Sequence, residues 1–232
     1  MTLKVKPRPE TSAMVAFQCE TADLQRVLDL LHGSKSRPVA VHLKSDGEPI
    51  GRKFWQVSAL FEEKKTTVAW QVATLLGDLK GTPVKQVEQH EKDLAQVVQS
   101  FADETAGRLQ GGDAPRFTFK ANVRPSQTAA FCAAAQASHS NLSVSAEGLN
   151  GIIHGSIVAD LTQLDAAAIL NKLTTLAAEG GGNVVVRRCP PAWKKSLAVW
   201  GRPSGDREMM RRVKQTLDPK NVFNPGRLFG DI

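Results

Sequence analysis

The chain has 232 residues, of which 41% are hydrophobic, and its formal net charge is +7. This length is enough for one large packed domain or two small ones. No run of 18 apolar residues occurs, so the sequence predicts no membrane span, and the N-terminus lacks the apolar stretch of a signal peptide. We therefore expect a cytoplasmic protein.

The basic residues are scattered along the chain in short pairs, and no aromatic-rich basic motif accompanies them. This pattern favours a solvated surface over a nucleic-acid site, although part of the charge is available for an anionic cofactor or substrate. The three cysteines, Cys19, Cys132 and Cys189, lie far apart in apolar contexts and form no CxxC pair. We expect buried, unreactive thiols and no zinc or iron–sulfur site in this chain.

The stretch from about residue 10 to residue 90 alternates between strand-like and helix-like patterns. The hydrophobic spacing predicts helices at 21–33, with Thr21 as the cap, and at 67–79. Strands are predicted at residues 13–19, 39–43, 54–61 and 84–88. The resulting order, βαββαβ, is that of a ferredoxin-like unit.

The stretch from about residue 115 to residue 190 repeats the same order. Helices are predicted at 125–138 and 164–179, and Gly148 to Gly151 predicts a hairpin turn. Strands are predicted at residues 116–123, 142–146, 152–158 and 183–188. A helix at 91–103 and a loop at 110–115 are expected to connect the two stretches.

The expected fold class is α+β, with tandem ferredoxin-like βαββαβ units that form a mostly antiparallel sheet. Helices are expected on one face of this sheet. A C-terminal helix and tail lie outside the repeat, because Met209, Met210, Val213 and Leu217 have helical spacing. The proline after Asp218 ends this helix, since a residue before proline avoids the helical region.

The tail carries the most distinctive pattern of the chain, which reads WG, then K, then DP, then FNPGR. Its residues are Trp200, Gly201, Lys214, Asp218, Pro219, Phe223, Asn224, Pro225, Gly226 and Arg227. The pattern resembles the C-terminal end of FAD-linked oxidases of the vanillyl-alcohol oxidase/PCMH superfamily, and most of all the E-subunit type of glycolate oxidase. The resemblance is specific from about Trp200 to Leu228.

This resemblance implies that two parts of the chain have different roles. Residues 1–200 would form the cap or substrate domain, and residues 201–232 the C-terminal helix and flavin-contacting tail. It also implies that Asn224, Pro225, Gly226 and Arg227 contact the flavin. Such groups tune the electronics of the flavin and do not perform the organic chemistry.

The resembled enzymes bind FAD mainly through an N-terminal domain with a glycine-rich loop. The chain contains no GxGxxG, and its triple glycine at 180–182 follows a predicted helix, so it reads as a helix stop. We therefore expect FAD to be held mainly by a missing domain or a partner chain. Other glycolate-oxidase-type subunits, including iron–sulfur ones, would be further partners, and such a complex could lie at the inner membrane.

The implied function is the substrate part of an FAD-dependent oxidase or dehydrogenase for a small 2-hydroxy acid, such as glycolate or D-lactate. Hydride would pass to the flavin in the complete enzyme, and this chain alone is expected to be inactive. A cation must hold the carboxylate of such a substrate, and Arg124, Arg187 and Arg188 are the candidates. His154 is the candidate acid or base.

The related subunit type of these oxidases carries metal-ligating histidines on a hairpin. The matching hairpin here, residues 147–154, keeps only His154. Because a catalytic metal usually needs about three protein ligands, the sequence predicts no metal. The other histidines, His42 among them, are expected at the surface.

Two other classes of function remain open from the sequence. One is a non-catalytic ferredoxin-like scaffold or ligand-binding subunit of a multi-subunit dehydrogenase. The other is an RNA-binding module, which only the net charge favours. Its base-stacking aromatics would be Phe17, Phe54, Phe117 and Phe119, which lack the pattern of RNA-binding ferredoxin-like domains.

Overall fold

The computed structural model describes residues 8–45, 54–90, 99, 101, 103, 116–202 and 205–226. The predicted connecting helix at 91–103 falls largely outside these ranges, although residues 99, 101 and 103 are helical. The predicted loop at 110–115 and the site residue Arg227 lie outside the described residues.

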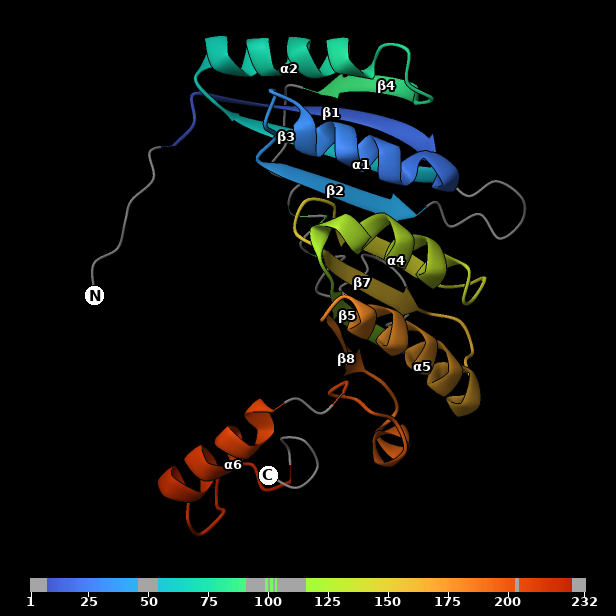
Figure 1. Ribbon diagram of the computed structural model, residues 1–232, viewed down its shortest axis with the longest axis vertical. Helices are drawn as coiled ribbons and strands as arrows, with labels where there is room; N and C mark the ends of the chain where they lie inside the picture. Colours follow the sequence, from blue (N-terminus) through green and yellow to red (C-terminus); the bar gives the residue numbers. More distant parts are fainter. Residues whose placement is uncertain are drawn as a thin grey trace.

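Within the described ranges, eight strands form one antiparallel sheet in the order β4-β1-β3-β2-β6-β7-β5-β8 (Figure 1). The strands are β1 Thr11–Glu20, β2 Ala40–Ser45, β3 Phe54–Glu63, β4 Lys85–His90, β5 Phe117–Asn122, β6 Ser143–Glu147, β7 Ile152–Ile157 and β8 Asn183–Arg188. Each half has its fourth, first, third and second strands side by side, as in a ferredoxin-like unit. The halves meet where β2 pairs with β6, and the predicted fold class is confirmed.

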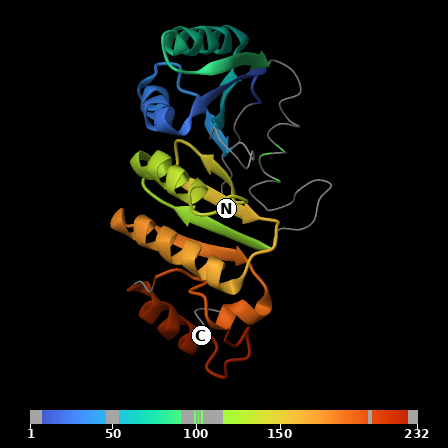
Figure 2. The same cartoon turned by 90° about the vertical axis from the view of Figure 1, so that its right-hand side faces the viewer.

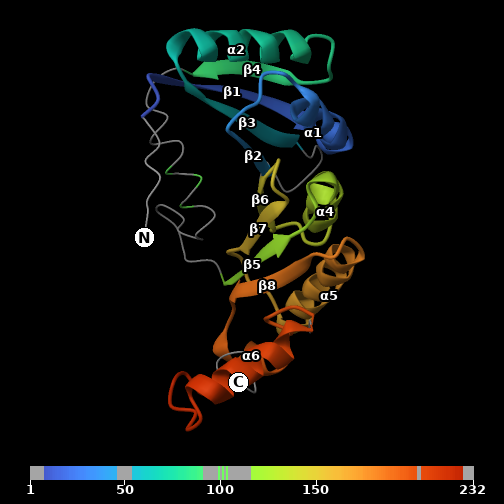
Figure 3. The ribbon, with the colours of Figure 1, turned by 60° about the vertical axis from the view of Figure 1, so that its left-hand side comes forward.

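Helices cover one face of this sheet, as Figures 2 and 3 show. They are α1 Leu24–Gly33, α2 Lys65–Leu79, α4 Thr128–Gln136 and α5 Gln163–Glu179. Three short 3₁₀ turns, Thr21–Asp23, Pro125–Gln127 and Pro191–Lys195, join helices and strands. The last helix, α6 Asp206–Leu217, lies beyond β8, at the end of the sheet.

The main core lies between the sheet and these four helices. Every second strand residue points to this face, so Phe17, Trp55, Phe117 and Phe119 are fully buried there. Phe17, Phe117 and Phe119 are among the aromatic residues that base stacking would need. Because they face helices, they are not available to an RNA ligand, which argues against the RNA-binding alternative.

Thr21 was predicted to cap the first helix, and this prediction is wrong. The α-helix starts at Leu24, and no side-chain cap bond is formed at its start. The Thr21 hydroxyl instead accepts a hydrogen bond from Trp55 Nε1 and donates one to Gln136 Oε1 of the other half, each at 3.1 Å. Thr21 therefore links the two halves through hydrogen bonds and does not cap the helix.

Gly155 on β7 supports a prediction about packing at the sheet. A methyl group at this position would overlap the buried ring of Phe119 on the paired strand β5. Gly155→Ala should therefore lower the free energy of unfolding by about 1–3 kcal/mol. Gly77→Ala is the matched control, because a Cβ at Gly77 in α2 meets nothing within 4 Å.

The control substitution should raise stability by about 0.5–1 kcal/mol, since alanine favours a helix over glycine. Urea denaturation followed by circular dichroism measures both variants. Equal effects of the two substitutions would show that the ring of Phe119 does not fill the space above Gly155.

Candidate functional site

A groove of about 1780 Å³ lies between the β8 end of the sheet and the C-terminal tail. One wall is formed by β8 and the segment that follows it, and the other by α6 and the residues after it. Seven residues of the distinctive tail pattern line this groove: Trp200, Gly201, Lys214, Asp218, Phe223, Asn224 and Gly226. Positions spread over 27 residues of sequence are thus gathered around one open space.

The carboxylate of Asp218 organises the turn that follows α6. Its side chain is only 6% exposed, and its two oxygens accept hydrogen bonds from the backbone amides of Val222 and Phe223, each at 2.8 Å. Lys214 forms an ion pair with the same carboxylate and also donates to the Phe223 carbonyl at 2.5 Å. The hydrogen bond from Lys214, aided by the two amides, lowers the pKa of Asp218.

The turn itself requires left-handed backbone conformations. Asn221, Asn224 and Gly226 have φ angles of 50°, 48° and 67°. Asparagine adopts this region more readily than other residues with a side chain, and glycine does so without strain. The sequence and Asp218 therefore fix the shape of the tail, with Asn224 in the groove lining and Asn221 outside it.

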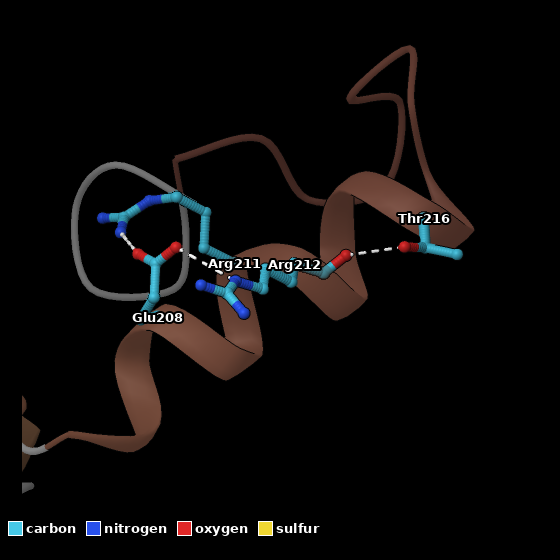
Figure 4. A network of polar contacts seen from close by, with 4 residues as sticks. All are labelled: Glu208, Arg211, Arg212 and Thr216. Carbon is cyan, nitrogen blue, oxygen red and sulfur yellow. Dashed lines mark hydrogen bonds and ion pairs between the residues drawn. The ribbon is translucent and has the colours of Figure 1, made fainter.

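Helix α6 has two contrasting faces. Glu208 pairs with Arg211 at 2.7 Å and with Arg212 at 3.3 Å, and the Thr216 hydroxyl donates to the Arg212 carbonyl (Figure 4). The apolar residues at helical spacing, Met209, Met210, Val213 and Leu217, are all exposed among the described residues, as is Phe223 in the tail. A row of exposed apolar side chains of this kind is typical of an interaction surface.

His154 lies on the face of the sheet opposite the helices. It is half-buried on β7, and its partners in the strand register are Lys120 on β5 and Ser145 on β6. Burial is the main cause that lowers the pKa of His154 to about 4. The positive charges of Arg187 and Lys120 act in the same direction, and Glu147 opposes them. The imidazole is therefore neutral at pH 7.

His42 was predicted at the surface, and this prediction is wrong. It lies on β2, is 7% exposed, and stacks on Phe101 with ring centroids 3.9 Å apart. Burial, followed by the charges of Lys44 and His154, lowers its pKa to about 4. Strand alternation already assigns His42 to the face of the sheet opposite the helices, and the Phe101 ring that stacks on it contributes to its burial.

The predicted site residues fall in different places. Asn224 and Gly226 line the groove, whereas Pro225 is exposed within the turn and is not among the lining residues. Arg124 is exposed two residues beyond the end of β5, outside the groove lining, where its carbonyl accepts from the Gln127 amide at 2.8 Å. The structure does not bring Arg124 and His154 together with the tail residues.

Arg187 and Arg188, the other candidate cations, do line the groove.

The three cysteines differ from one another in burial. Cys19 and Cys132 are buried as predicted, and burial raises the pKa of both thiols, to about 12 for Cys19. Cys189 is only half-buried and lines the groove, so the prediction of burial is wrong for this residue.

The described part of the chain holds no group of three or more His, Cys, Asp or Glu side chains suited to a metal ion. The predicted lack of a metal stays a prediction for the whole chain. None of the helices that the structure describes is long and apolar enough to cross a membrane.

Comparison with known proteins supports the tail as the distinctive part of the chain. Residues 200–228 match the family of FAD linked oxidases, C-terminal domain. This match supports FAD as the cofactor. Among curated proteins, no sequence matches the chain significantly.

The fold is similar to that of several solved oxidases. For p-cresol methylhydroxylase with substrate bound, the TM-score is 0.63 at 15% identity, over 97% of this chain and 54% of that one. For 4-ethylphenol oxidase from Gulosibacter chungangensis, the TM-score is 0.60 at 15% identity, over 98% of this chain and 55% of that one. For a chitooligosaccharide oxidase, the TM-score is 0.52 at 13% identity, over 97% of this chain and 56% of that one. The chain spans about half the length of these structures.

Proposed function

We propose that this chain is the substrate-side part of an FAD-dependent oxidoreductase of the glycolate oxidase E-subunit type. In this proposal residues 1–200 cap the substrate, and residues 201–232 close over the flavin. The observation that carries the proposal is the gathering of the tail pattern, from Trp200 to Gly226, around one groove. The substrate class that we propose is a small 2-hydroxy acid such as glycolate or D-lactate.

The groove has the donor chemistry that the edge of a flavin requires. Asn224 supplies an amide side chain, and the turn around Gly226 brings backbone groups to the groove. Arg187, Arg188 and Lys195 add positive charge, which suits a ring system that becomes more negative when reduced. We assign Asn224 and Gly226, which line the groove, together with their sequence neighbours Pro225 and Arg227, to flavin contact. The flavin, when bound, supplies the hydride acceptor.

The partner that we propose is an FAD-binding domain, either elsewhere in the same protein or on a separate chain. The exposed apolar side chains of α6 and the 70% exposed Phe223 provide a surface that such a domain would cover. Further subunits of the glycolate oxidase type, including iron–sulfur ones, belong to the same proposal. So does a cytoplasmic location, or attachment to the inner membrane through the complex.

Turnover by the reconstituted enzyme tests the proposal. The chain and its FAD-binding partner are mixed, and the visible absorbance of oxidised flavin is followed after addition of glycolate or D-lactate. We expect the absorbance to be lost when both parts and a 2-hydroxy acid are present, and to persist when either part is missing. Persistence with both acids would contradict the substrate class while leaving FAD binding to be judged by titration.

Two asparagines of the tail provide a matched pair of variants. Asn224→Gly removes a side chain that lines the groove, and Asn221→Gly removes one outside it, at nearly the same φ angle. Because glycine relieves the strain of a positive φ angle, both turns should be retained. Flavin reduction should slow by about 10- to 100-fold in Asn224→Gly, as for a lost hydrogen bond at the reacting group. Equal rates in the two variants would contradict the assignment of Asn224.

A further inference from the structure

The net charge of the chain is concentrated at its C-terminal end. Residues 1–115 contain fifteen Lys and Arg against fifteen Asp and Glu, and residues 116–186 contain four against four. Residues 187–232 contain eleven against four, so the end of the chain carries the whole excess of +7. The chain up to residue 186 is formally neutral, and the positive charge belongs to the part that forms the groove.

Four of these cations are exposed and line the groove, and together they are called the basic rim: Arg187, Arg188, Lys194 and Lys195. In the part of the chain that the structure describes, no carboxylate pairs with the last three of them. Two carboxylates of the tail are engaged within the tail itself, because Asp218 pairs with Lys214 and Glu208 pairs with arginines of its own helix. Positive charge at the rim is therefore left for a partner to balance.

Exposed apolar side chains face the same groove from the wall that α6 forms. They are Met209, Met210, Val213 and Leu217, and the exposed ring of Phe223 follows them in the tail. An apolar centre bordered by charged residues is the usual arrangement of a protein–protein interface. The combination of this wall with the basic rim therefore points to a protein surface as the partner.

The position of the apolar side chains argues against the two other anionic partners. An amphipathic helix binds a bilayer with its apolar face turned onto the membrane plane, whereas the apolar side chains of α6 line a groove of about 1780 Å³. Nucleic acid binds mainly through its charged phosphates and offers little apolar surface to cover the methionines of α6. A protruding protein segment fits both the concave shape and the chemistry.

We propose that the FAD-binding partner presents an acidic, partly apolar surface to this groove, and that attraction to the basic rim steers the two parts together. Opposite charges on two protein surfaces raise the association rate by about 10- to 1000-fold, and dissolved salt screens this effect. The acidic surface also aligns the partner with the tail, because wrong orientations place like charges together.

This inference rests on the proposed function for the identity of the partner, and it adds the chemistry of the surface that docks. The chain spans about half the length of the solved oxidases with this fold, so a further domain of similar size accompanies the fold in those proteins. Localised charge gives that domain a direction of approach, which the neutral remainder of this chain does not supply.

Association rates at different salt concentrations test the inference. The chain and its FAD-binding partner are produced separately and mixed without flavin, and association is followed by tryptophan fluorescence, because the exposed Trp200 lines the groove. We expect the association rate constant to fall by at least about tenfold between about 0.05 M and 0.5 M NaCl. A rate constant that does not depend on salt would overturn the inference.

A pair of double variants separates the basic rim from charge in general. Lys194→Gln with Lys195→Gln should slow association at low salt by about three- to tenfold. Lys64→Gln with Lys65→Gln is the matched control, because it removes the same charge from two exposed lysines at the start of α2, at the other end of the sheet (Figure 1). It should associate like the unaltered chain, and equal slowing in both double variants would contradict a role for the rim.

Two further probes identify the class of partner. Vesicles of phosphatidylcholine and phosphatidylglycerol, and a single-stranded RNA, are titrated into the chain at low salt. We expect both to bind more weakly than the FAD-binding partner. Tighter binding of either one, weakened by Lys194→Gln with Lys195→Gln, would assign the rim to that class and overturn the acidic protein surface.

An FAD titration of the same mixtures separates this inference from the proposed function. FAD binding with association that salt does not affect would keep the flavoenzyme and reject the acidic surface. Salt-dependent association without FAD binding would reject the flavoenzyme and keep the docking surface. Absence of any association would reject both.

Discussion

Asp218→Ala will release the tail turn and reduce the affinity of the assembled enzyme for FAD by about 10- to 100-fold. The physical reason is that the backbone amides of Val222 and Phe223 lose their acceptor, and the Lys214 ammonium loses its ion-pair partner. Hydrogen bonds to a charged carboxylate are stronger than those between neutral groups, so their loss costs more. Asn224, which the turn holds in the groove, would then no longer be fixed in position.

The matched control is Glu208→Gln, because Glu208, which lies within α6, is also an acidic residue paired with cations. Its ion pairs are exposed, and exposed pairs contribute little to stability. Hydrogen–deuterium exchange should show faster exchange of the Val222 and Phe223 amides in Asp218→Ala only. Unchanged exchange in that variant would mean that the tail keeps its shape without this carboxylate.

Acidification from pH 6.5 to pH 4 should destabilise the protein, with His42 as a main cause. Burial lowers the pKa of His42 from 6.5 to about 4, so in this window the unfolded chain binds a proton that the folded chain does not. Stability therefore rises with pH across the window, is fully present above pH 6.5 and is lost as pH falls. A shift of this size corresponds to on the order of 3 kcal/mol.

His42→Phe separates this effect from other titrations. Phenylalanine keeps a ring that can stack on Phe101, but it removes the titrating group. Urea denaturation at several pH values between 4 and 7 should give a flatter profile for the variant than for the unaltered chain. His154, whose pKa is also about 4, stays in both proteins and maintains part of the slope. Parallel profiles would show that His42 is not buried in neutral form.

Local sequence patterns were sufficient for most of the described strands and helices and for the faces that they bury. The alternation of Phe117 and Phe119 with polar residues predicts a half-buried strand, and both side chains are buried against helices. The spacing of the tail likewise predicts α6, which ends at Leu217 as expected. These features depend on neighbours within a few residues, which the sequence displays directly.

Features that depend on distant partners were not predicted. Thr21 forms hydrogen bonds with Trp55 and Gln136, and no local sequence pattern predicts such a link between the two halves. The burial of His42 depends on Phe101, which is 59 positions further along the chain.

The pairing of His154 with Lys120 and Ser145 depends on strand register within the second half. Register follows from the packing of the whole sheet, and short-range sequence patterns do not show which residues pair between distant strands. The sequence named His154 as a candidate but could not supply its neighbours.

The most direct test of the central claim is an FAD titration of this chain, alone and with its FAD-binding partner, followed by flavin absorbance and fluorescence. We expect tight binding only when both are present, because this chain supplies the groove and tail while the partner holds most of the cofactor. Tight binding to this chain alone would contradict the proposed division of the cofactor site. No binding in either mixture would contradict the flavoenzyme itself and favour a scaffold protein.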